Sequence, residues 1–278
     1  MKQKRIVVVN DFSGFGRCSL TVSLPIISAM KIQCCALPTA VLSNHTGYDD
    51  YFFDDYTDKM KNYYSKWEKL GLRFDGIYTG FLGSVRQVEI INDFIHKFKT
   101  ENTLVIVDPV MGDNGRTYDT LTKELCIKIR ELLPVADVIT PNITEACILS
   151  GTPYGGEAPD DDLVKEVLKK LYTFGCKSVV LTGVRRKDML LNFVYDGKNT
   201  DTVSSEITGQ ERAGTGDVFA SVLAGAMMNG DTLKDAVKKA ADFTANAVGL
   251  SEKMNIPTQD GICFEEILST IIPDTHRH

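Results

Sequence analysis

Short apolar runs, many of them β-branched, alternate along this chain with longer segments in which apolar positions recur every three to four residues. The short runs predict strands and the longer segments predict helices. The expected strands cover residues 6–9, 32–42, 76–79, 104–107, 135–139, 178–182, 190–195 and 199–207. The expected helices cover residues 19–30, 57–70, 84–99, 121–133, 143–150, 161–174, 217–228 and 232–250.

Several of the expected strands are apolar throughout, which is typical of a parallel sheet covered on both faces. The alternation of strands and helices therefore predicts a doubly wound α/β fold with a mostly parallel central sheet. Residues 188–207 differ, because a turn at 196–198 joins two strands into a β-hairpin. Two helices follow, and Thr232, three residues before Asp235, resembles the start of a capping box. No linker or repeat interrupts the pattern, so we expect one domain over residues 1–278.

The composition excludes several classes of function. The 278 residues carry a formal net charge of −6, so no broad basic surface is available for nucleic acid or an anionic membrane. No signal peptide or membrane-length apolar run is present, and we expect a cytoplasmic protein. The seven cysteines form no C-x-x-C motif and are expected to be small core residues in a reducing compartment. The terminal His276 and His278 are expected to belong to a tail and not to a metal site.

Polar residues and glycines follow the predicted strands, where open α/β sheets bind their ligands. They lie in residues 10–16, 43–48, 80–84, 108–113, 140–145 and 182–183. The pair Gly14 and Gly16 lacks the third glycine of a dinucleotide fingerprint. This absence favours a tight turn at a strand–helix junction over a nicotinamide oxidoreductase.

The strongest local signal is Gly214-Thr215-Gly216-Asp217, at the start of an apolar helix. Glycines there let backbone N–H groups face an anion, which the helix dipole also favours. An aspartate at that position can accept the proton of a hydroxyl that attacks a phosphoryl group. The alternative, equally consistent with the local pattern, is that Asp217 only caps the helix.

Asp108 and Glu145 each follow a predicted strand and could share a Mg²⁺ ion, which prefers oxygen ligands. The alternative is that both carboxylates stand at helix starts and interact with the helix dipole. The residues alone slightly favour this second interpretation.

Taken together and in order, these motifs resemble one family. Gly214–Asp217, the Asp-Pro-Val-Met that begins at Asp108 and the Thr-Pro-Asn-x-x-Glu of 140–145 resemble the vitamin-kinase branch of the ribokinase-like superfamily. The Ser-Asn-His-Thr-Gly-Tyr of 43–48 and the Thr-Gly-Phe-Leu-Gly-Ser of 79–84 resemble the vitamin B6 (pyridoxal, pyridoxine and pyridoxamine) kinases. The resemblance covers essentially the whole chain. It implies ATP-dependent phosphorylation of the 5′-hydroxymethyl group of B6 vitamers, and it favours the catalytic interpretation of Asp217.

The resemblance also implies roles for individual residues. Asp217 would be the catalytic base and would contact the substrate, and the backbone of Gly214, Thr215 and Gly216 would form the anion hole. The other residues that contact the vitamin would be Asp11, Ser13, Thr46, Gly47 and Phe81.

On the nucleotide side, the resemblance implies a set of ATP-binding residues and a flap at 112–118. The ATP-binding residues would be Asp108, Asp113, Tyr118, Thr140, Glu145, Thr182 and Thr215. Asp108, Asn142 and Glu145 would orient Mg²⁺, and such kinases often use K⁺ or Na⁺ beside the anion hole. The expected partners are ATP, a small heteroaromatic alcohol and a second copy of the chain, bound through a sheet edge or the hairpin.

Two departures from the B6 kinase pattern leave alternatives open. Asp11 replaces a usual serine, and Asp11-x-Ser13-Gly14 resembles hydroxymethylpyrimidine kinases, so hydroxymethylpyrimidine or its phosphate is the alternative substrate. Phe81 stands where tyrosine is common and lacks its hydroxyl. An ionised Asp11 can accept but not donate a hydrogen bond, which suggests a preference for pyridoxamine or pyridoxine over pyridoxal. A catalytically silent binding protein is disfavoured, because it would not need Asp217.

Overall fold

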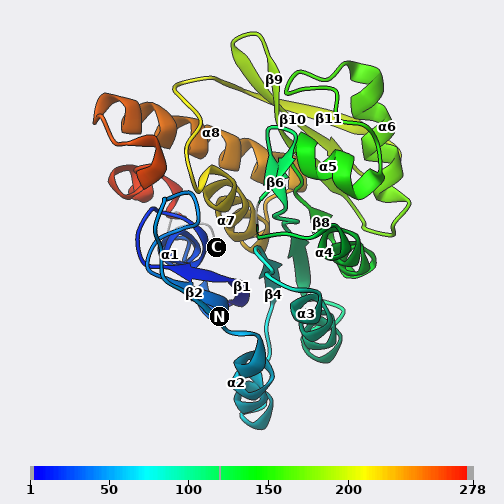
Figure 1. Ribbon diagram of the computed structural model, residues 1–278, viewed down its shortest axis with the longest axis vertical. Helices are drawn as coiled ribbons and strands as arrows, with labels where there is room; N and C mark the ends of the chain where they lie inside the picture. The colour runs from blue at the N-terminus through cyan, green and yellow to red at the C-terminus, as the bar shows by residue number, and fades with distance from the viewer. Residues whose placement is uncertain (1–2, 119, 274–278) are drawn as a thin grey trace.

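The chain folds into one large sheet with helices on both faces (Figure 1). The structure is a computed structural model and describes residues 3–118 and 120–273, so the predicted terminal tail with His276 and His278 lies outside the described residues. Nine strands pair in the order β11-β10-β9-β8-β5-β4-β1-β2-β3. They are β1 (Arg5–Ser13), β2 (Gln33–Leu42), β3 (Phe53–Asp55), β4 (Gly76–Thr79), β5 (Leu104–Val107), β8 (Val138–Ile139), β9 (Val179–Arg186), β10 (Met189–Tyr195) and β11 (Thr200–Glu206).

The sheet is mixed but mostly parallel, which confirms the predicted fold class. The six strands from β9 to β2 pair in parallel, while β10, β11 and β3 pair antiparallel at the two sides. The predicted hairpin is confirmed as β10 and β11, and β9 extends it to three antiparallel strands. Two short strands, β6 (Gly112–Asp113) and β7 (Arg116–Thr117), form a separate hairpin.

Two layers of helices cover the sheet. One face packs against α1 (Ser19–Ala29), α7 (Thr215–Met228) and α8 (Leu233–Lys253). The other packs against α2 (Thr57–Lys69), α3 (Val85–Phe98), α4 (Lys123–Lys128), α5 (Ile143–Ser150) and α6 (Asp161–Tyr172). No helix in the described part of the chain is long and apolar enough to cross a membrane.

The apolar run of β1 is continuous because both faces of this strand are buried. Successive side chains point to opposite faces, so Ile6 and Val8 join the core under α1 and α7. Val7 and Val9 join the core under α2 and α3. All four side chains are fully buried, as a central parallel strand requires.

The region around residue 130 contradicts two predictions. The helix expected over 121–133 is only the short α4, continued by a 3-10 helix, η1 (Ile129–Val135). Pro134 explains the change, because its ring and missing N–H are incompatible with an α-helix interior. The strand expected over 135–139 is correspondingly reduced to Val138–Ile139.

Other differences concern elements without a clear hydrophobic period. The pattern did not predict β3, the β6–β7 hairpin or the 3-10 helices η2 (Thr258–Asp260) and η3 (Glu265–Ile271). Helix α7 begins two residues earlier than expected, at Thr215. Thr232 caps α8 as predicted, because its side chain accepts the Asp235 N–H.

Candidate active site

The carboxyl ends of the central strands meet in register at one edge of the sheet. The N–H of Gly80, just after β4, donates to the carbonyl oxygen of Val9 at 2.8 Å. The N–H of Asp108, just after β5, donates to the Thr79 carbonyl oxygen, also at 2.8 Å. The loops that follow β1, β4 and β5 are therefore held side by side, which brings the predicted site segments together.

Asp217 lies in the first turn of α7 but does not cap it. The N-cap is Gly214, and no side chain makes a capping hydrogen bond there, so the capping interpretation is wrong. One carboxylate oxygen of Asp217 instead accepts a hydrogen bond from Asn10 Nδ2 at 3.0 Å, across from the end of β1. The Ser19 N–H donates to the same carboxylate.

Burial, together with the nearby Asp11, raises the pKa of Asp217 to about 6, although the hydrogen bonds from Ser19 and Asn10 oppose the rise. A carboxylate with this pKa is ionised at neutral pH and is a better proton acceptor than an exposed aspartate. Its environment therefore suits a general base.

The two glycines before Asp217 meet different constraints. Gly214 has a φ of +71°, and a Cβ atom there would lie 1.9 Å from the Arg17 carbonyl oxygen. Gly216 has no such conformation, and a Cβ atom there would meet nothing within 4 Å. Gly214 is therefore required by the fold, whereas Gly216 leaves open space above the first turn of α7, where the backbone N–H groups lack helical partners.

Asp11 lies below the surface beside Asp217. Its two carboxylate oxygens accept hydrogen bonds from the hydroxyls of Ser13 at 2.7 Å and Ser19 at 2.6 Å. Burial raises the pKa of Asp11, and the hydrogen bonds from Ser19 and Ser13 oppose the rise. Asp11 therefore orients two hydroxyl groups at the strand end.

The segment 43–48 is fastened to the C-terminal part of the chain. His45 Nε2 lies 2.7 Å from the Gln259 carbonyl oxygen, and the Tyr48 hydroxyl donates to Asp260 Oδ1 at 2.7 Å. The Gln259 side chain donates to the carbonyl oxygen of Gly47 at 2.8 Å. Thr46 and Gly47 are thus exposed at the top of a loop whose position is fixed by η2.

His45 also explains the turn after β1. A Cβ atom at Gly16, whose φ is +108°, would lie 2.4 Å from the His45 ring. The two glycines of 14–16 therefore form a tight strand–helix junction, as predicted. The junction brings the loop of 43–48 close to Asp11.

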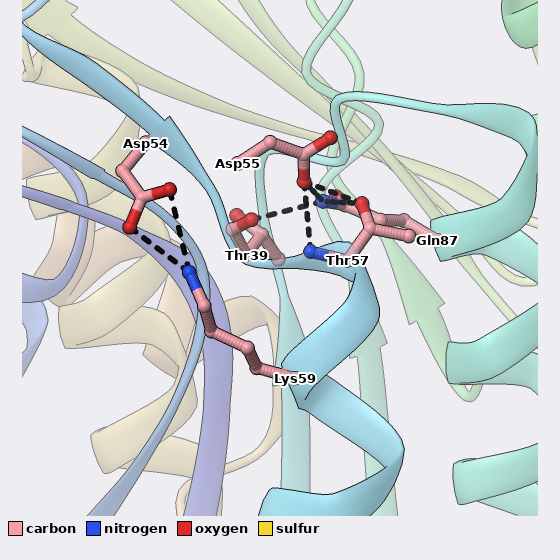
Figure 2. Close-up of polar contacts among 6 residues, drawn as sticks. All are labelled: Thr39, Asp54, Asp55, Thr57, Lys59 and Gln87. Atoms are coloured by element: carbon pink, nitrogen blue, oxygen red, sulfur yellow. Dashed lines mark hydrogen bonds and ion pairs between the residues drawn. The ribbon is translucent and has the colours of Figure 1, made fainter.

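Phe81 is half-buried, and its loop is held at both ends by buried carboxamides. The Phe81 N–H donates to Asn10 Oδ1 at 2.9 Å, and the Gly83 N–H donates to Gln87 Oε1 at 2.8 Å. Figure 2 shows the Gln87 side chain reaching Thr39 and Thr57, which anchors the loop to β2 and α2.

On the other side of Asp217, Asp108 and Glu145 are both buried. Burial, Glu145 and Asp217 together raise the pKa of Asp108 well above its usual value. Asp108 precedes no helix, so the helix-start interpretation is wrong for this residue.

Glu145, by contrast, forms the capping box of α5. Its carboxylate oxygens accept the N–H groups of Met111 at 3.0 Å and Asn142 at 2.9 Å. Asn142 Oδ1 accepts the Glu145 N–H, and its Nδ2 donates to Gly112. Burial raises the pKa of Glu145 to about 8 despite these hydrogen bonds. The helix-start interpretation therefore holds for Glu145.

Asp108 and Glu145 suit a divalent cation that takes most of its ligands from water and phosphate and only a few from the protein. Asp108 is 8% exposed, and its pKa is raised first by burial and then by repulsion from Glu145 and Asp217, which a cation would relieve. The described residues contain no cluster of three or more His, Cys, Asp or Glu that could enclose a metal. This donor set suits Mg²⁺, which retains waters and phosphate ligands and needs few protein oxygens.

The predicted flap is the β6–β7 hairpin. Its Gly115 N–H donates to Thr144 Oγ1 at 2.9 Å, and Asn142 Nδ2 donates to its Gly112 carbonyl oxygen. Asp113 Oδ1 accepts the Asn114 N–H, and Tyr118 is 43% exposed at the hairpin's end. The hairpin is thus held against the start of α5.

Thr140 and Thr182, the other predicted nucleotide residues, lie next to this hairpin's anchor. Thr140 is buried at the end of β8. Asn142 and Thr182 form an isolated parallel bridge, and the Thr182 N–H donates to the Pro141 carbonyl oxygen at 2.9 Å. The structure therefore groups the predicted nucleotide residues around α5, except Thr215, which begins α7, and it groups the predicted vitamin residues around β1.

Sequence reasoning assigned no role to Asn10, Gln87, Gln259 or Asp260. Asn10 was visible as the first polar residue after an apolar strand. The other three gave no signal, because each has a partner far away in the chain. Thr57 lies 30 residues from Gln87, Gly47 lies 212 from Gln259, and Tyr48 lies 212 from Asp260.

Comparison with known proteins adds independent information. Residues 27–262 match the family model described as phosphomethylpyrimidine kinase. A provisionally assigned phosphomethylpyrimidine kinase of Bacteroides thetaiotaomicron, crystallised with pyridoxal, is 39% identical with a TM-score of 0.93, covering 99% of this chain and 98% of that one. The pyridoxine kinase of Bacillus subtilis is 31% identical over 66% of this chain and 68% of its own. The hydroxymethylpyrimidine/phosphomethylpyrimidine kinase of Aquifex aeolicus is 32% identical over 64% of this chain and 69% of its own.

Proposed function

This chain belongs to the phosphomethylpyrimidine kinase family and is a phosphotransferase with an alcohol acceptor, and we propose that it transfers the γ-phosphoryl group of ATP to the 5′-hydroxymethyl group of a B6 vitamer. The observation that carries the proposal is the position of Asp217. A half-buried carboxylate stands in the same helical turn as the glycine backbone that suits an anion.

The proposed reaction uses Asp217 as the general base. The 5′-hydroxyl oxygen forms a bond to the γ-phosphorus, and the bond from that phosphorus to the β–γ bridging oxygen breaks. The hydroxyl proton passes to Asp217, and ADP leaves with the bridging oxygen. The N–H groups at Gly214, Thr215 and Gly216 stabilise the negative charge on the transferring group, where most of the rate acceleration arises.

The remaining predicted residues have supporting roles in this proposal. Thr46, Gly47 and Phe81 contact the ring of the vitamin, while Asp11 acts through the hydroxyls of Ser13 and Ser19 that it orients. The ATP side is formed by Asp108, Asp113, Tyr118, Thr140, Glu145, Thr182 and Thr215. Asp108, Asn142 and Glu145 would hold Mg²⁺, which would supply a counter-charge for the phosphates of ATP.

Hydroxymethylpyrimidine or its phosphate is the second candidate acceptor. The Asp11-x-Ser13-Gly14 segment and the Aquifex aeolicus relative favour it. The Ser-Asn-His-Thr segment of 43–46 and the pyridoxal in the Bacteroides thetaiotaomicron structure favour a B6 vitamer. We give these two observations more weight, because the relative that contains pyridoxal matches 99% of this chain, whereas the Aquifex aeolicus relative matches 64% of it.

A substrate panel tests the proposal. The purified protein, with ATP and Mg²⁺, is offered pyridoxal, pyridoxine, pyridoxamine and hydroxymethylpyrimidine, and ADP release and the phosphorylated product are measured. We expect at least one B6 vitamer to exceed hydroxymethylpyrimidine in kcat/KM by about tenfold or more, with pyridoxamine or pyridoxine ahead of pyridoxal. A preference for hydroxymethylpyrimidine would favour the second candidate, and phosphorylation of none of the four would reject the proposed acceptor class.

A further inference from the structure

Asn10 is fully buried at the end of β1, and its carboxamide joins three parts of the site. Its Nδ2 donates to Asp217 Oδ1 at 3.0 Å. Its Oδ1 accepts the Phe81 N–H at 2.9 Å and the Asp11 N–H at 3.0 Å. A single side chain thus touches the proposed base and the loop that carries Phe81.

The orientation of this carboxamide is determined by its partners. Because two backbone N–H groups face one end of the amide, that end must be the oxygen, and the NH₂ group must face Asp217. The backbone just after β4 leaves just enough room for the side chain, since a Cβ atom at Gly80 would lie 2.4 Å from Asn10 Nδ2. The side chain therefore cannot turn over without losing both backbone contacts.

We propose that Asn10 is a positioning residue, which holds the Asp217 carboxylate ready to accept the hydroxyl proton and ties it to the 80–83 loop against which the acceptor ring binds. This inference rests on the proposed kinase function. It assigns to β1 a part in orienting the base that α7 alone does not provide.

The surroundings of Asp217 show why such a donor matters. The ionisable groups that the structure places around it are Asp11, Cys18, Tyr78, Asp108 and Tyr118. Each of them is neutral when protonated and negatively charged when ionised, so none of these five groups offers Asp217 a positive charge. A hydrogen-bond donor aimed at the carboxylate favours its ionised form, in which it can act as a base.

Gln87 provides a matched comparison within the same molecule. Like Asn10 it is a buried carboxamide that holds the loop of 80–83, through the Gly83 N–H. Its Nε2 donates instead to the Thr39 carbonyl oxygen and the Thr57 hydroxyl (Figure 2). Gln87 therefore shares the contact with the loop and lacks the contact with the base.

The experiment compares the pH dependence of kcat/KM for the best B6 vitamer in the full-length wild type, Asn10→Asp and Gln87→Met. Asn10→Asp keeps an acceptor for both backbone N–H groups and replaces the donor to Asp217 with an acceptor. We expect its acid limb to move to higher pH by about one unit or more, with kcat/KM lowered about fivefold or more at pH 6, where Asp217 of the wild type is about half ionised. Gln87→Met is expected to raise KM for the vitamin several-fold and to leave the limb in place.

The titrations of ATP and the vitamin are common to all variants, so differences between the limbs report the protein. An Asn10→Asp limb that coincides with the wild-type limb would overturn the proposal, and so would an equal displacement in Gln87→Met. If Asn10→Asp does not fold, Asn10→Ala, which removes the donor without adding charge, must shift the limb in the same direction. An inactive wild type would count against the proposed function. An active wild type whose acid limb coincides with that of the Asn10 variant would count against the role of Asn10 alone.

Discussion

Gly214 and Gly216 stand two residues apart at the start of α7, but they lack a side chain for different reasons. Gly214 allows the backbone conformation, whereas Gly216 leaves the space above the first turn open. Gly214 combines a φ of +71° with a Cβ position 1.9 Å from the Arg17 carbonyl oxygen, whereas the Cβ position of Gly216 is open. Substitutions at the two positions should therefore separate folding from catalysis.

We expect Gly216→Ala to leave the thermal stability unchanged or slightly higher, because alanine favours a helix by about 1 kcal/mol over glycine. Its methyl group would stand where the phosphoryl group has to approach, and kcat should fall about 100-fold. Gly214→Ala should instead lower the free energy of unfolding by at least about 1–2 kcal/mol. Thermal melts and steady-state kinetics on both variants check this, and full activity in a stable Gly216→Ala variant would contradict it.

The raised pKa of Asp217 has a consequence for stability. Because the folded-state pKa is about 6 and the ordinary value is 3.8, the folded protein binds the proton more tightly than the unfolded chain, and stability falls as pH rises from about 4 to 6. Removing the charge should therefore stabilise the protein at neutral pH by up to about 3 kcal/mol.

Asp217→Asn should accordingly melt several degrees above the wild type at pH 7.5, and the difference should shrink as pH approaches 4, where the folded carboxyl is protonated and about half of the unfolded carboxyl is protonated too. Differential scanning calorimetry at pH 4.5, 6 and 7.5 measures this. A variant less stable than the wild type at pH 7.5 would show that the ionised carboxylate is stabilised by the fold and not strained by it.

At the scale of elements, the β6–β7 hairpin is attached to α5 by few contacts, of which the Gly115 N–H to Thr144 Oγ1 bond is one. The hairpin carries Asp113 and ends near Tyr118, both proposed to face the nucleotide. Its position should therefore affect ATP binding more than the chemical step.

Thr144→Val is expected to raise KM for ATP about fivefold, corresponding to the loss of one hydrogen bond worth about 1 kcal/mol, with kcat nearly unchanged. Thr144→Ser keeps the hydroxyl and serves as the control. Equal KM values for ATP in the two variants would mean that this bond does not hold the hairpin in its nucleotide-binding position.

Hydrophobic periodicity predicted the long elements well and the short ones poorly. The apolar run of β1 and the amphipathic spacing of α8 are strong because each buries a continuous face. Pro134 replaced the end of a predicted helix with a 3-10 segment, and the two-residue strands of the β6–β7 hairpin are too short to show any period.

The candidate site was predictable where its chemistry is local. Gly214–Asp217 stand in one helical turn, and Glu145 forms a capping box with Asn142 three residues before it. The contact of Asn10 with Asp217 joins residues 207 apart, so it depends on the pairing of strands and helices. No local pattern encodes such a contact.

For the whole molecule, the net charge of −6 gains a more specific meaning from the structure. The acidic groups that crowd the site are Asp11, Asp108, Glu145 and Asp217, and burial raises the pKa of each. A polyphosphate would be repelled by them unless a cation accompanied it. The charge therefore fits a nucleotide that binds together with Mg²⁺ at a helix N-terminus, in place of a broad basic surface.

The measurement that tests the account most directly is phosphoryl transfer by Asp217→Asn, followed under saturating ATP, Mg²⁺ and the best B6 vitamer, with binding of both substrates measured in parallel by calorimetry. The account predicts that kcat falls by about 10²–10⁴-fold, while the dissociation constants for ATP and the vitamin change only a few-fold, because the substitution removes a proton acceptor and preserves the shape of the site. Turnover within a few-fold of the wild type, in a variant that binds both substrates, would contradict the assignment of Asp217 as the base.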